Sequence, residues 1–472
     1  MIGRKNEQER LLSALENEES EFIAVYGRRR VGKTYLIRQT FGNGFAFYHT
    51  GLAKSPMSDQ LAAFGASLNE YGGEVAEPPK NWLEAFTRLR RLLEKSSGGK
   101  KVVFIDELPW MDTPRSRFLP AVENFWNSWA SARTDIVFVI CGSATSWIIR
   151  KVIRNHGGLH NRLTGKIRVK PFTLAECEEY AESRRLGMSR QQIAEAYMAF
   201  GGIPHYWSFL RKELSLAQNI DNIFFAEDGE LAGEFDELYA SLFRRKQIHI
   251  GLVTLLAKHR AGLNREQIVK LGGTANNGRL TERLEELEQC GFIRSYHVVG
   301  SCKSDLVYQL TDFFSFFYFA FIAKNLKRDE EYWTNHYGDG AFMEWRGRAF
   351  EMLAVQHIRE IKAALGIAGV GAECGCWRHV ADETHPQGVQ IDLVIDRDDK
   401  VINLCEMKCT EEPYAIDAEE DRLLRRHREV FRKVTGTVKS LHQTMVVAAG
   451  LVKNMYANSV QKVITLDDLY AR

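Results

Sequence analysis

The segment GRRRVGKT, residues 27–34, leaves few folds open to the chain around it. Two glycines followed by Lys-Thr at this spacing are typical of a loop whose backbone N–H groups wrap a phosphate. Residues 22–26 before it are apolar and favour a strand, whereas the residues from 34 onward favour a helix. The sequence therefore predicts a strand, a phosphate-binding loop and a helix in succession.

Short strand-like segments recur along the first part of the chain. Residues 21–27, 44–50, 101–107 and 135–143 are rich in β-branched and aromatic residues, and helix-compatible stretches lie between them. Parallel strands require such crossovers, so we expect an α/β domain with a parallel sheet and helices on both faces. The strand pattern stops near residue 205.

Composition restricts the class of protein. The chain has 472 residues, which is enough for about three domains. Its net charge of +2 does not indicate a nucleic acid or any other charged partner. Its eight cysteines are scattered along the chain, so we expect reduced thiols in a cytoplasmic protein. The start, MIGRKNEQER, lacks the apolar segment of a signal peptide. The longest apolar run, residues 313–323, is about half the length of a bilayer-spanning helix, so we expect no membrane segment.

The loop and the third strand-like segment predict ATP hydrolysis. Lys33 is placed to reach the β- and γ-phosphate oxygens of ATP, and the Thr34 hydroxyl is placed to bind Mg²⁺. Residues 102–105 form a buried strand that brings Asp106 and Glu107 to the ligand-binding edge of the sheet. We expect Asp106 to hold Mg²⁺ through water and Glu107 to orient or deprotonate the attacking water.

Other polar residues extend this prediction. Ser143 follows the fourth strand-like segment and is placed to sense the γ-phosphate. Arg162 is a candidate arginine finger, although an isolated arginine also serves as a surface ion-pair partner. Whether Arg162 acts in its own subunit or in a neighbour's stays open, and so does the oligomeric state. The loop arginines Arg28, Arg29 and Arg30 either stabilise phosphate charge or point to solvent.

Six segments between residues 2 and 207 carry a family resemblance. IGRKNEQERL, YGRRRVGKT, VVFIDELPW, CGSATSW, GGLHNRL and GGIPHYW together resemble the archaeal-type P-loop ATPases of the AAA+/STAND group. The resemblance implies that Ile2, Gly3 and Arg4 lie near the adenine, and that the turn at residues 202–204 packs against the nucleotide from a helical lid. The expected nucleotide contacts are Ile2, Gly3, Arg4, Gly27, Arg28, Arg29, Arg30, Val31, Gly32, Lys33, Thr34, Tyr35, Asp106, Ser143 and Pro204.

Residues 241–312 predict a winged helix-turn-helix. Three segments with helical spacing precede two short strands around the turn GSCKSD. The second helix is expected at residues 264–272 and the recognition helix at residues 277–289. The recognition helix carries Arg279 and Arg283 against Glu282, Glu285, Glu286 and Glu288, which gives +2 − 4 = −2. Because carboxylates are repelled by phosphates, contact with DNA and docking of a protein partner both stay open.

Further along, two strand-like segments, VQIDLVID and VINLCEMKC, are joined by the polar turn RDDK. Side chains alternate along a strand, so Gln390, Asp392 and Val394 are expected on one face of the first. Glu406 and Lys408 are expected on one face of the second. Two carboxylates can share Mg²⁺ or Mn²⁺, and a lysine beside them can orient or activate water for attack on a phosphodiester.

The spacing D-x13-E-x-K, preceded by Glu351 on a predicted helix, resembles the PD-(D/E)xK restriction-endonuclease-like superfamily. The region also resembles a C-terminal domain of unknown function that accompanies archaeal-type ATPases. The resemblance implies that Glu351, Asp392 and Glu406 bind a divalent metal and that Lys408 takes part in catalysis. The alternative is an inactive domain that binds DNA or docks partners.

Four cysteines fall in this last region. Cys374, Cys376, Cys405 and Cys409 form C-x-C and C-x3-C pairs, which is not a common zinc-site spacing. We therefore expect buried free thiols.

The expected division is an ATPase core at 1–205, a helical lid at 206–240, a winged helix at 241–312, a linker helix at 313–345 and a restriction-endonuclease-like α/β domain at 346–472. This organisation predicts a Mg²⁺-dependent, ATP-hydrolysing switch that couples nucleotide state to DNA binding or cleavage. The alternative is a regulatory ATPase whose winged helix and inactive nuclease-like domain dock protein partners. A small-molecule kinase is disfavoured, because no acceptor-binding domain is recognisable.

Overall fold

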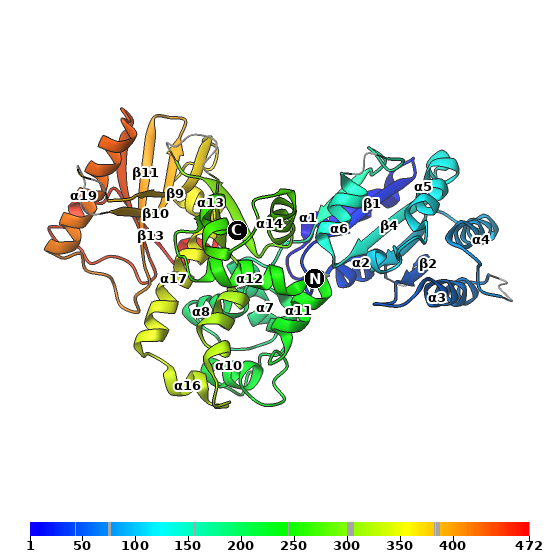
Figure 1. Ribbon diagram of the computed structural model, residues 1–472, viewed down its shortest axis with the longest axis horizontal. Coiled ribbons are helices and arrows are strands. Elements are labelled where there is room, and N and C mark those ends of the chain that lie inside the picture. The colour runs from blue at the N-terminus through cyan, green and yellow to red at the C-terminus, as the bar shows by residue number, and fades with distance from the viewer. Residues whose placement is uncertain are drawn as a thin grey trace. The chain divides into compact units, whose positions relative to one another are not determined.

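The computed structural model describes residues 1–42, 44–73, 77–154, 157–243, 245–299, 306–381, 383 and 388–471. The chain folds as two compact units, Met1–Pro171 and Phe172–Arg472, and Figure 1 labels their elements. The division falls earlier than the expected domain end at residue 205, because helices α7 (Leu174–Ser183) and α8 (Arg190–Phe200) pack within the second unit. The other expected boundaries remain predictions, and the predicted turn at residues 300–305 lies outside the described residues.

The first unit contains five parallel strands in the order β2-β3-β4-β1-β5. They are β1 (Glu21–Tyr26), β2 (Phe45–Thr50), β3 (Lys101–Asp106), β4 (Ile136–Gly142) and β5 (Gly165–Arg168). The four strands expected from the sequence and their parallel direction are confirmed. The sequence does not predict β5, because its four residues, GKIR, contain a single buried apolar side chain.

Helices connect these strands and position the loop. They are α1 (Lys5–Glu16), α2 (Lys33–Phe41), α3 (Met57–Glu70), α4 (Trp82–Lys95), α5 (Phe118–Ser128) and α6 (Thr145–Ile148), which a π-helical turn at Ile149–Ile153 extends. β4 lies between β1 and β3, so the carboxyl ends of these three strands are neighbours. The residues that follow those ends therefore meet at one edge of the sheet.

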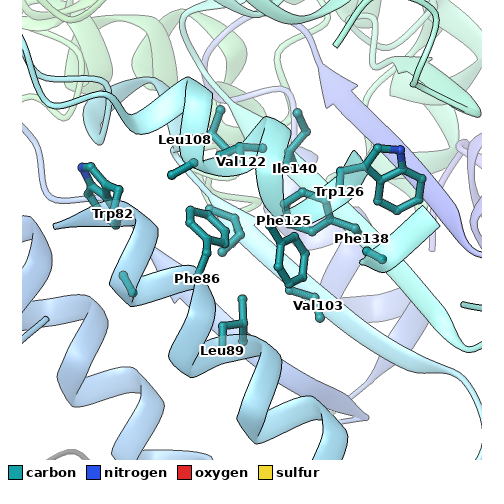
Figure 2. Close-up of a cluster of buried hydrophobic side chains, with 14 of the residues drawn as sticks. Trp82, Phe86, Leu89, Val103, Leu108, Val122, Phe125, Trp126, Phe138 and Ile140 are labelled. Atoms are coloured by element: carbon teal, nitrogen blue, oxygen red, sulfur yellow. The ribbon is translucent and has the colours of Figure 1, made fainter. Parts of the chain in front are cut away.

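A cluster of buried side chains joins α4 and α5 to one face of this sheet (Figure 2). Trp82, Phe86 and Leu89 recur at helical spacing along α4, and Phe125 comes from α5. The ring of Phe125 lies 5.5 Å from that of Phe138 on β4, centroid to centroid. Burial of each such side chain stabilises the fold by about 1.5–3 kcal/mol, so the strands that carry the site are held rigidly.

The second unit begins with helices and a small sheet. Its helices are α7, α8, α9 (Pro204–Trp207), α10 (Leu216–Phe224), α11 (Glu234–Leu242), α12 (Lys246–Ala257), α13 (Arg265–Gly272), α14 (Gly278–Gln289), α15 (Phe313–Ala320), α16 (Tyr332–His336), α17 (Gly340–Gln356), α18 (Ile358–Ala364) and α19 (Ala418–Thr435). The antiparallel strands β6 (Leu263–Asn264), β8 (Leu306–Leu310) and β7 (Ile293–His297) lie in that order. The helices predicted at 264–272 and 277–289 are confirmed as α13 and α14.

The Phe-rich run is the buried helix α15, as its length indicates. Phe317 lies within 5.1 Å of Trp333 and 5.5 Å of Trp345, centroid to centroid. No helix in the described part of the chain is both long and apolar enough to cross a bilayer.

A five-stranded mixed sheet ends the unit, in the order β13-β12-β11-β10-β9. Its strands are β9 (Ala372–His379), β10 (Val389–Arg397), β11 (Val401–Lys408), β12 (Ser440–Val447) and β13 (Lys462–Thr465). β9, β10 and β11 pair antiparallel, whereas β12 joins β11 in parallel after the crossover helix α19. The predicted strands β10 and β11 are confirmed, and the helix predicted to carry Glu351 is α17, which meets α18 at His357.

Candidate nucleotide site and carboxylate cluster

The phosphate loop joins β1 to α2 and needs both of its glycines. Gly27 has φ 151°, and a Cβ there would lie 2.2 Å from the carbonyl oxygen of Val169. Gly32 has φ 87°, which places it in the left-handed region that side chains disfavour. The loop conformation thus follows from the two glycines that the sequence motif singled out.

Lys33 is the first residue of α2 and is held inside the loop. Its side chain is buried, and Nζ donates hydrogen bonds to the carbonyl oxygens of Gly27 at 3.0 Å and Arg28 at 2.9 Å. A phosphate oxygen is a stronger acceptor for an ammonium group than a neutral carbonyl. The lysine is therefore anchored where an anionic group at the loop would attract it.

The two predicted Mg²⁺ ligands, Thr34 and Asp106, are in direct contact. Thr34 Oγ1 donates a hydrogen bond to Asp106 Oδ2 at 2.8 Å. Asp106 is buried at the end of β3, and this burial raises the pKa of its carboxyl, an effect that the hydrogen bond from Thr34 opposes. A hydroxyl and a carboxylate side by side at a phosphate loop supply the hard oxygen ligands that Mg²⁺ prefers, so these residues fit the ion.

Glu107 is held by Ser143, a pairing that the sequence does not predict. Glu107 has a left-handed backbone, with φ 48°, and its N–H donates to Asp106 Oδ1 at 2.9 Å. Its carboxylate accepts hydrogen bonds from Ser143 Oγ at 2.5 Å and from the Ser143 N–H at 3.2 Å. The residues that end β3 and β4 thus fix the orientation of Glu107, whereas γ-phosphate sensing by Ser143 stays a prediction.

Arg4 fastens the start of the chain to the phosphate loop. Its Nη2 donates to the carbonyl oxygens of Val31 at 3.3 Å and Lys170 at 2.6 Å. Tyr35 and Arg162 are exposed. The predicted contacts of Ile2, Gly3, Arg4 and the loop arginines with nucleotide, and the finger role of Arg162, stay predictions.

The turn at residues 202–204 belongs to the second unit and has a structural role there. A Cβ on Gly202 would lie 2.0 Å from the carbonyl oxygen of Phe172, and the Phe172 N–H donates to the Gly202 carbonyl at 2.6 Å. Pro204 opens the short helix α9. Its predicted contact with nucleotide stays a prediction.

The four predicted residues of the C-terminal region gather at the centre of the mixed sheet. Leu393 on β10 pairs with Cys405 on β11, and one further step of this antiparallel register places Asp392 opposite Glu406. Lys408 Nζ lies 3.3 Å from Glu406 Oε1. The hairpin between β10 and β11 thus explains why thirteen residues separate Asp392 from Glu406.

One expectation about this strand is wrong. Gln390 and Val394 do not share a face, because Val394 lies in a buried apolar cluster with Val389 and Ile391, the two chain neighbours of Gln390. The pairing of β10 with β9 shifts between Ile391 and Val394, which is a β-bulge. A bulge inserts an extra residue and reverses the alternation beyond it.

The carboxylates raise one another's pKa. Burial, followed by repulsion from Asp392, raises the pKa of Glu351 to about 8 and that of Glu406 to about 7. Burial also raises the pKa of Asp392, against the attraction of Arg260 and Lys408. Asp392 Oδ2 is buried and has no hydrogen-bond partner among the described residues. Such an oxygen is costly to bury unless something binds it, and carboxylate oxygens are the type of ligand that a divalent cation prefers.

Arg260 lies between two of the proposed metal ligands, and no motif predicts it. Its Nε donates to Glu351 Oε2 at 2.7 Å, and its Nη2 donates to Asp392 Oδ1 at 2.9 Å. Within the described residues, no group of three or more His, Cys, Asp or Glu side chains is arranged to hold a metal ion. The set Glu351, Asp392 and Glu406 is thus present, but a guanidinium stands where the first two face each other.

The four cysteines of this region are free thiols, as expected, but only Cys376 and Cys405 are buried, whereas Cys374 and Cys409 are half-buried. The thiol of Cys376 donates to the hydroxyl of Tyr296.

Comparison with known proteins connects the first site to a family. Residues 1–208 match the model of a family described as an ATPase domain predominantly from Archaea. An uncharacterised protein of Methanocaldococcus jannaschii is 24% identical over 416 residues, which cover 85% of this chain and 86% of that protein.

Two solved structures show partial likeness. A Walker-type ATPase of Pyrococcus abyssi aligns at 17% identity and a TM-score of 0.46, covering 67% of this chain and 95% of that one. The ORC2 protein of Aeropyrum pernix, solved in ADPNP and ADP complexes, aligns at 15% identity and a TM-score of 0.39, covering 66% and 90%.

The loop geometry and the contact between Thr34 and Asp106 define the first unit as a P-loop nucleotide-binding domain. Residues 1–208 are an ATPase domain of the archaeal type. The expectation of an archaeal-type ATPase core is therefore confirmed.

Proposed function

We propose that this ATPase uses Mg²⁺-ATP as a switch that controls the action of its C-terminal carboxylate cluster on DNA. The direct contact of Thr34 with Asp106, next to the buried Lys33, carries the nucleotide part of the proposal. The convergence of Glu351, Asp392, Glu406 and Lys408 supports the DNA part.

At the nucleotide site, different residues have separate roles in ATP binding and hydrolysis. Lys33 neutralises phosphate charge, and Thr34 and Asp106 hold Mg²⁺, which supplies further charge neutralisation when it is bound. Glu107 accepts the proton of the attacking water, and Ser143 orients the Glu107 carboxylate. The pair Glu107–Ser143 also links the two strand ends, so a change at the phosphates is passed to both β3 and β4.

The topology of the mixed sheet supports a nuclease-like role for the C-terminal region. Three antiparallel strands are followed by the crossover helix α19 and a parallel fourth strand, and Asp392 and Glu406 lie on the two central strands β10 and β11. Glu351, Asp392 and Glu406 would hold Mg²⁺ or Mn²⁺, which would stabilise charge on a phosphodiester. Lys408 is placed to orient water beside them.

The segment α12–β8, residues 246–310, supports a winged helix that contacts DNA. Two of the four glutamates of α14 face its own body, since Glu286 bonds to His249 at 3.0 Å and Glu288 accepts from the Ser295 N–H at 2.8 Å. Arg279 and the remaining Glu282, Glu285 and Arg283 balance to +2 − 2 = 0. The acidic character of the helix is thus weaker at its outer surface than in its sequence.

The helix α19 offers a more basic surface than α14. It carries Arg422, Arg425, Arg426, Arg428, Arg432 and Lys433 against four acidic residues, Glu419, Glu420, Asp421 and Glu429, which gives +6 − 4 = +2. The acidic residues are mostly in its first turn, so the rest of the helix is strongly positive. Glu420 at its start bonds to Lys408 of the carboxylate cluster at 3.0 Å. A DNA backbone along α19 would therefore pass close to the cluster.

We expect replacement of Arg422, Arg432 and Lys433 by glutamine to weaken DNA binding. These side chains are exposed, and loss of three phosphate contacts lowers the slope of log affinity against log salt by about 2–3. Fluorescence anisotropy with duplex DNA at several salt concentrations measures this. The matched control replaces the exposed Arg90, Arg91 and Lys95 of α4 and is expected to leave the slope unchanged. Equal effects of the two triple variants would contradict a specific role of α19.

Cleavage of plasmid and single-stranded DNA tests the proposed function. Cleavage in Mg²⁺ or Mn²⁺ is expected for the wild type and lost in Asp392→Ala. Its dependence on ATP is expected to be lost in Lys33→Ala. If DNA stays intact in every metal and nucleotide state while ATP is hydrolysed, the region is a docking module for protein partners, which is the alternative function.

A further inference from the structure

The turn that carries Arg260 is firmly anchored beside the carboxylate cluster. It connects α12 to β6, and three side chains hold its backbone. Gln309 Nε2 donates to the Arg260 carbonyl at 2.7 Å, the Tyr296 hydroxyl donates to the Ala261 carbonyl at 2.9 Å, and Arg348 Nη2 donates to the Ala257 carbonyl at 3.0 Å. These bonds fix the backbone of the turn, and the Arg260 side chain extends from it to the acids.

The guanidinium binds both carboxylates at once. It donates to Glu351 through Nε and to Asp392 through Nη2, as described above, and Nη2 also contacts Glu351 Oε1. A single cation thus bridges the two acids, which is the arrangement that a divalent metal would require. Arginine stays charged at every accessible pH, so a divalent cation that binds the same carboxylate oxygens has to displace it.

The space beside Arg260 has room for a small ligand. A cavity of about 40 Å³ is lined by Arg260, Glu351, Asp392 and Gln390, among others. This volume is on the scale of one or a few water molecules or ions. Asp392, whose buried Oδ2 has no hydrogen-bond partner among the described residues, is one of the lining residues. The guanidinium therefore leaves part of the acid cluster unsatisfied.

Arg260 and the acids of the cluster differ in their exposure to solvent. The Arg260 side chain is 44% exposed, whereas that of Asp392 is 5% exposed. The acids are thus fixed in the interior, and the arginine is the member that can leave.

We propose that Arg260 is a built-in plug of the C-terminal metal site, binding Glu351 and Asp392 in place of a divalent cation. Arg260 and the cation then bind in competition, and a movement of the α12–β8 segment frees the acids. This rests on the proposed metal site. Arg260 is not part of the sequence motif. Because it belongs to the α12–β8 segment, a movement of the winged helix would change the occupancy of the carboxylate cluster through this one side chain.

Binding of Mn²⁺ to the full-length chain tests the plug. Isothermal titration is carried out without nucleotide in an Asp106→Asn background, so that the first unit contributes little. Arg260→Gln is expected to bind Mn²⁺ about tenfold more tightly than the parent, because a competing cation is removed. Adding Asp392→Asn is expected to abolish the gain. The matched control, Arg378→Gln, removes another exposed arginine of the same unit and should leave the affinity unchanged.

The possible outcomes separate the two proposals. If the parent binds Mn²⁺ in an Asp392-dependent way and Arg260→Gln does not tighten it, the plug is overturned while the metal site stands. If neither protein binds Mn²⁺, the metal site fails and Arg260 is a permanent ion-pair partner. Should Arg260→Gln not fold, Arg260→Lys keeps the charge but loses the two-point contact, and an intermediate gain in affinity is then expected.

Discussion

Replacement of Glu107 by glutamine is expected to lower the rate of ATP hydrolysis by about 100-fold or more. Glutamine has nearly the same shape but cannot accept the proton of the attacking water. Nucleotide affinity is expected to change little, because Lys33 and the loop are untouched. Steady-state hydrolysis together with binding of a fluorescent ATP analogue measures the two effects separately.

Three other variants give this prediction its controls. Lys33→Ala is expected to reduce nucleotide affinity as well as turnover, since Nζ is the charged group held inside the loop. Ser143→Ala is expected to lower kcat about tenfold with little effect on affinity, because it only orients Glu107. Lys80→Ala removes an exposed lysine and should match the wild type. Hydrolysis that survives in Glu107→Gln would assign the proton acceptor elsewhere.

The sequence predicts the nucleotide site well because its parts follow from local patterns. A strand ends where its apolar run ends, and parallel strands bring their carboxyl ends to one edge. Thr34 and Asp106 therefore meet, although 72 residues separate them. Local patterns do not predict the hydrogen bond between Ser143 and Glu107. It depends on the side-chain rotamer and on the left-handed backbone of Glu107.

In the C-terminal region, local sequence patterns predict some neighbours of the carboxylates and miss others. A hairpin fixes the register, so the spacing of Asp392 and Glu406 does predict that they are neighbours. The expected alternation of side chains is interrupted before Val394 by a bulge. A bulge cannot be recognised in a sequence segment whose residues are almost all apolar. Arg260 lies 91 residues before Glu351 and 132 before Asp392. Only packing of the α12–β8 segment against α17 and β10 brings it there.

We expect the stability of the carboxylate cluster to fall as pH rises from about 5 to about 8. Glu351 has a pKa of about 8 in the folded protein, against 4.5 as its ordinary value. Between these values the folded state keeps a proton that the unfolded chain has released, so unfolding becomes easier with rising pH. Each pH unit costs up to about 1.4 kcal/mol for one such group. Burial and repulsion by Asp392 are the causes.

Glu351→Gln removes the titration of Glu351 itself. The variant is expected to gain stability over the wild type progressively above pH 5, reaching about 1–3 kcal/mol near pH 8. Hydrogen exchange at the amides of β10 and β11, corrected for the intrinsic rate at each pH, measures the local opening free energy. Glu412→Gln changes an exposed carboxylate and is the control.

The way in which the stability difference between Glu351→Gln and the wild type changes with pH shows whether Glu351 is protonated or ionised in the folded protein. If the stability of Glu351→Gln relative to the wild type is constant or falls as pH rises, Glu351 is ionised throughout, and its attraction to Arg260 outweighs burial and repulsion. Glu406→Gln should show the same rise, complete nearer pH 7, because the pKa of Glu406 is about 7. If the stability gains of the two variants are complete at different pH values, Glu406 releases its proton at a lower pH than Glu351. A cation that enters the cluster below pH 8 would then displace its last proton from Glu351, the carboxylate that Arg260 holds through both oxygens.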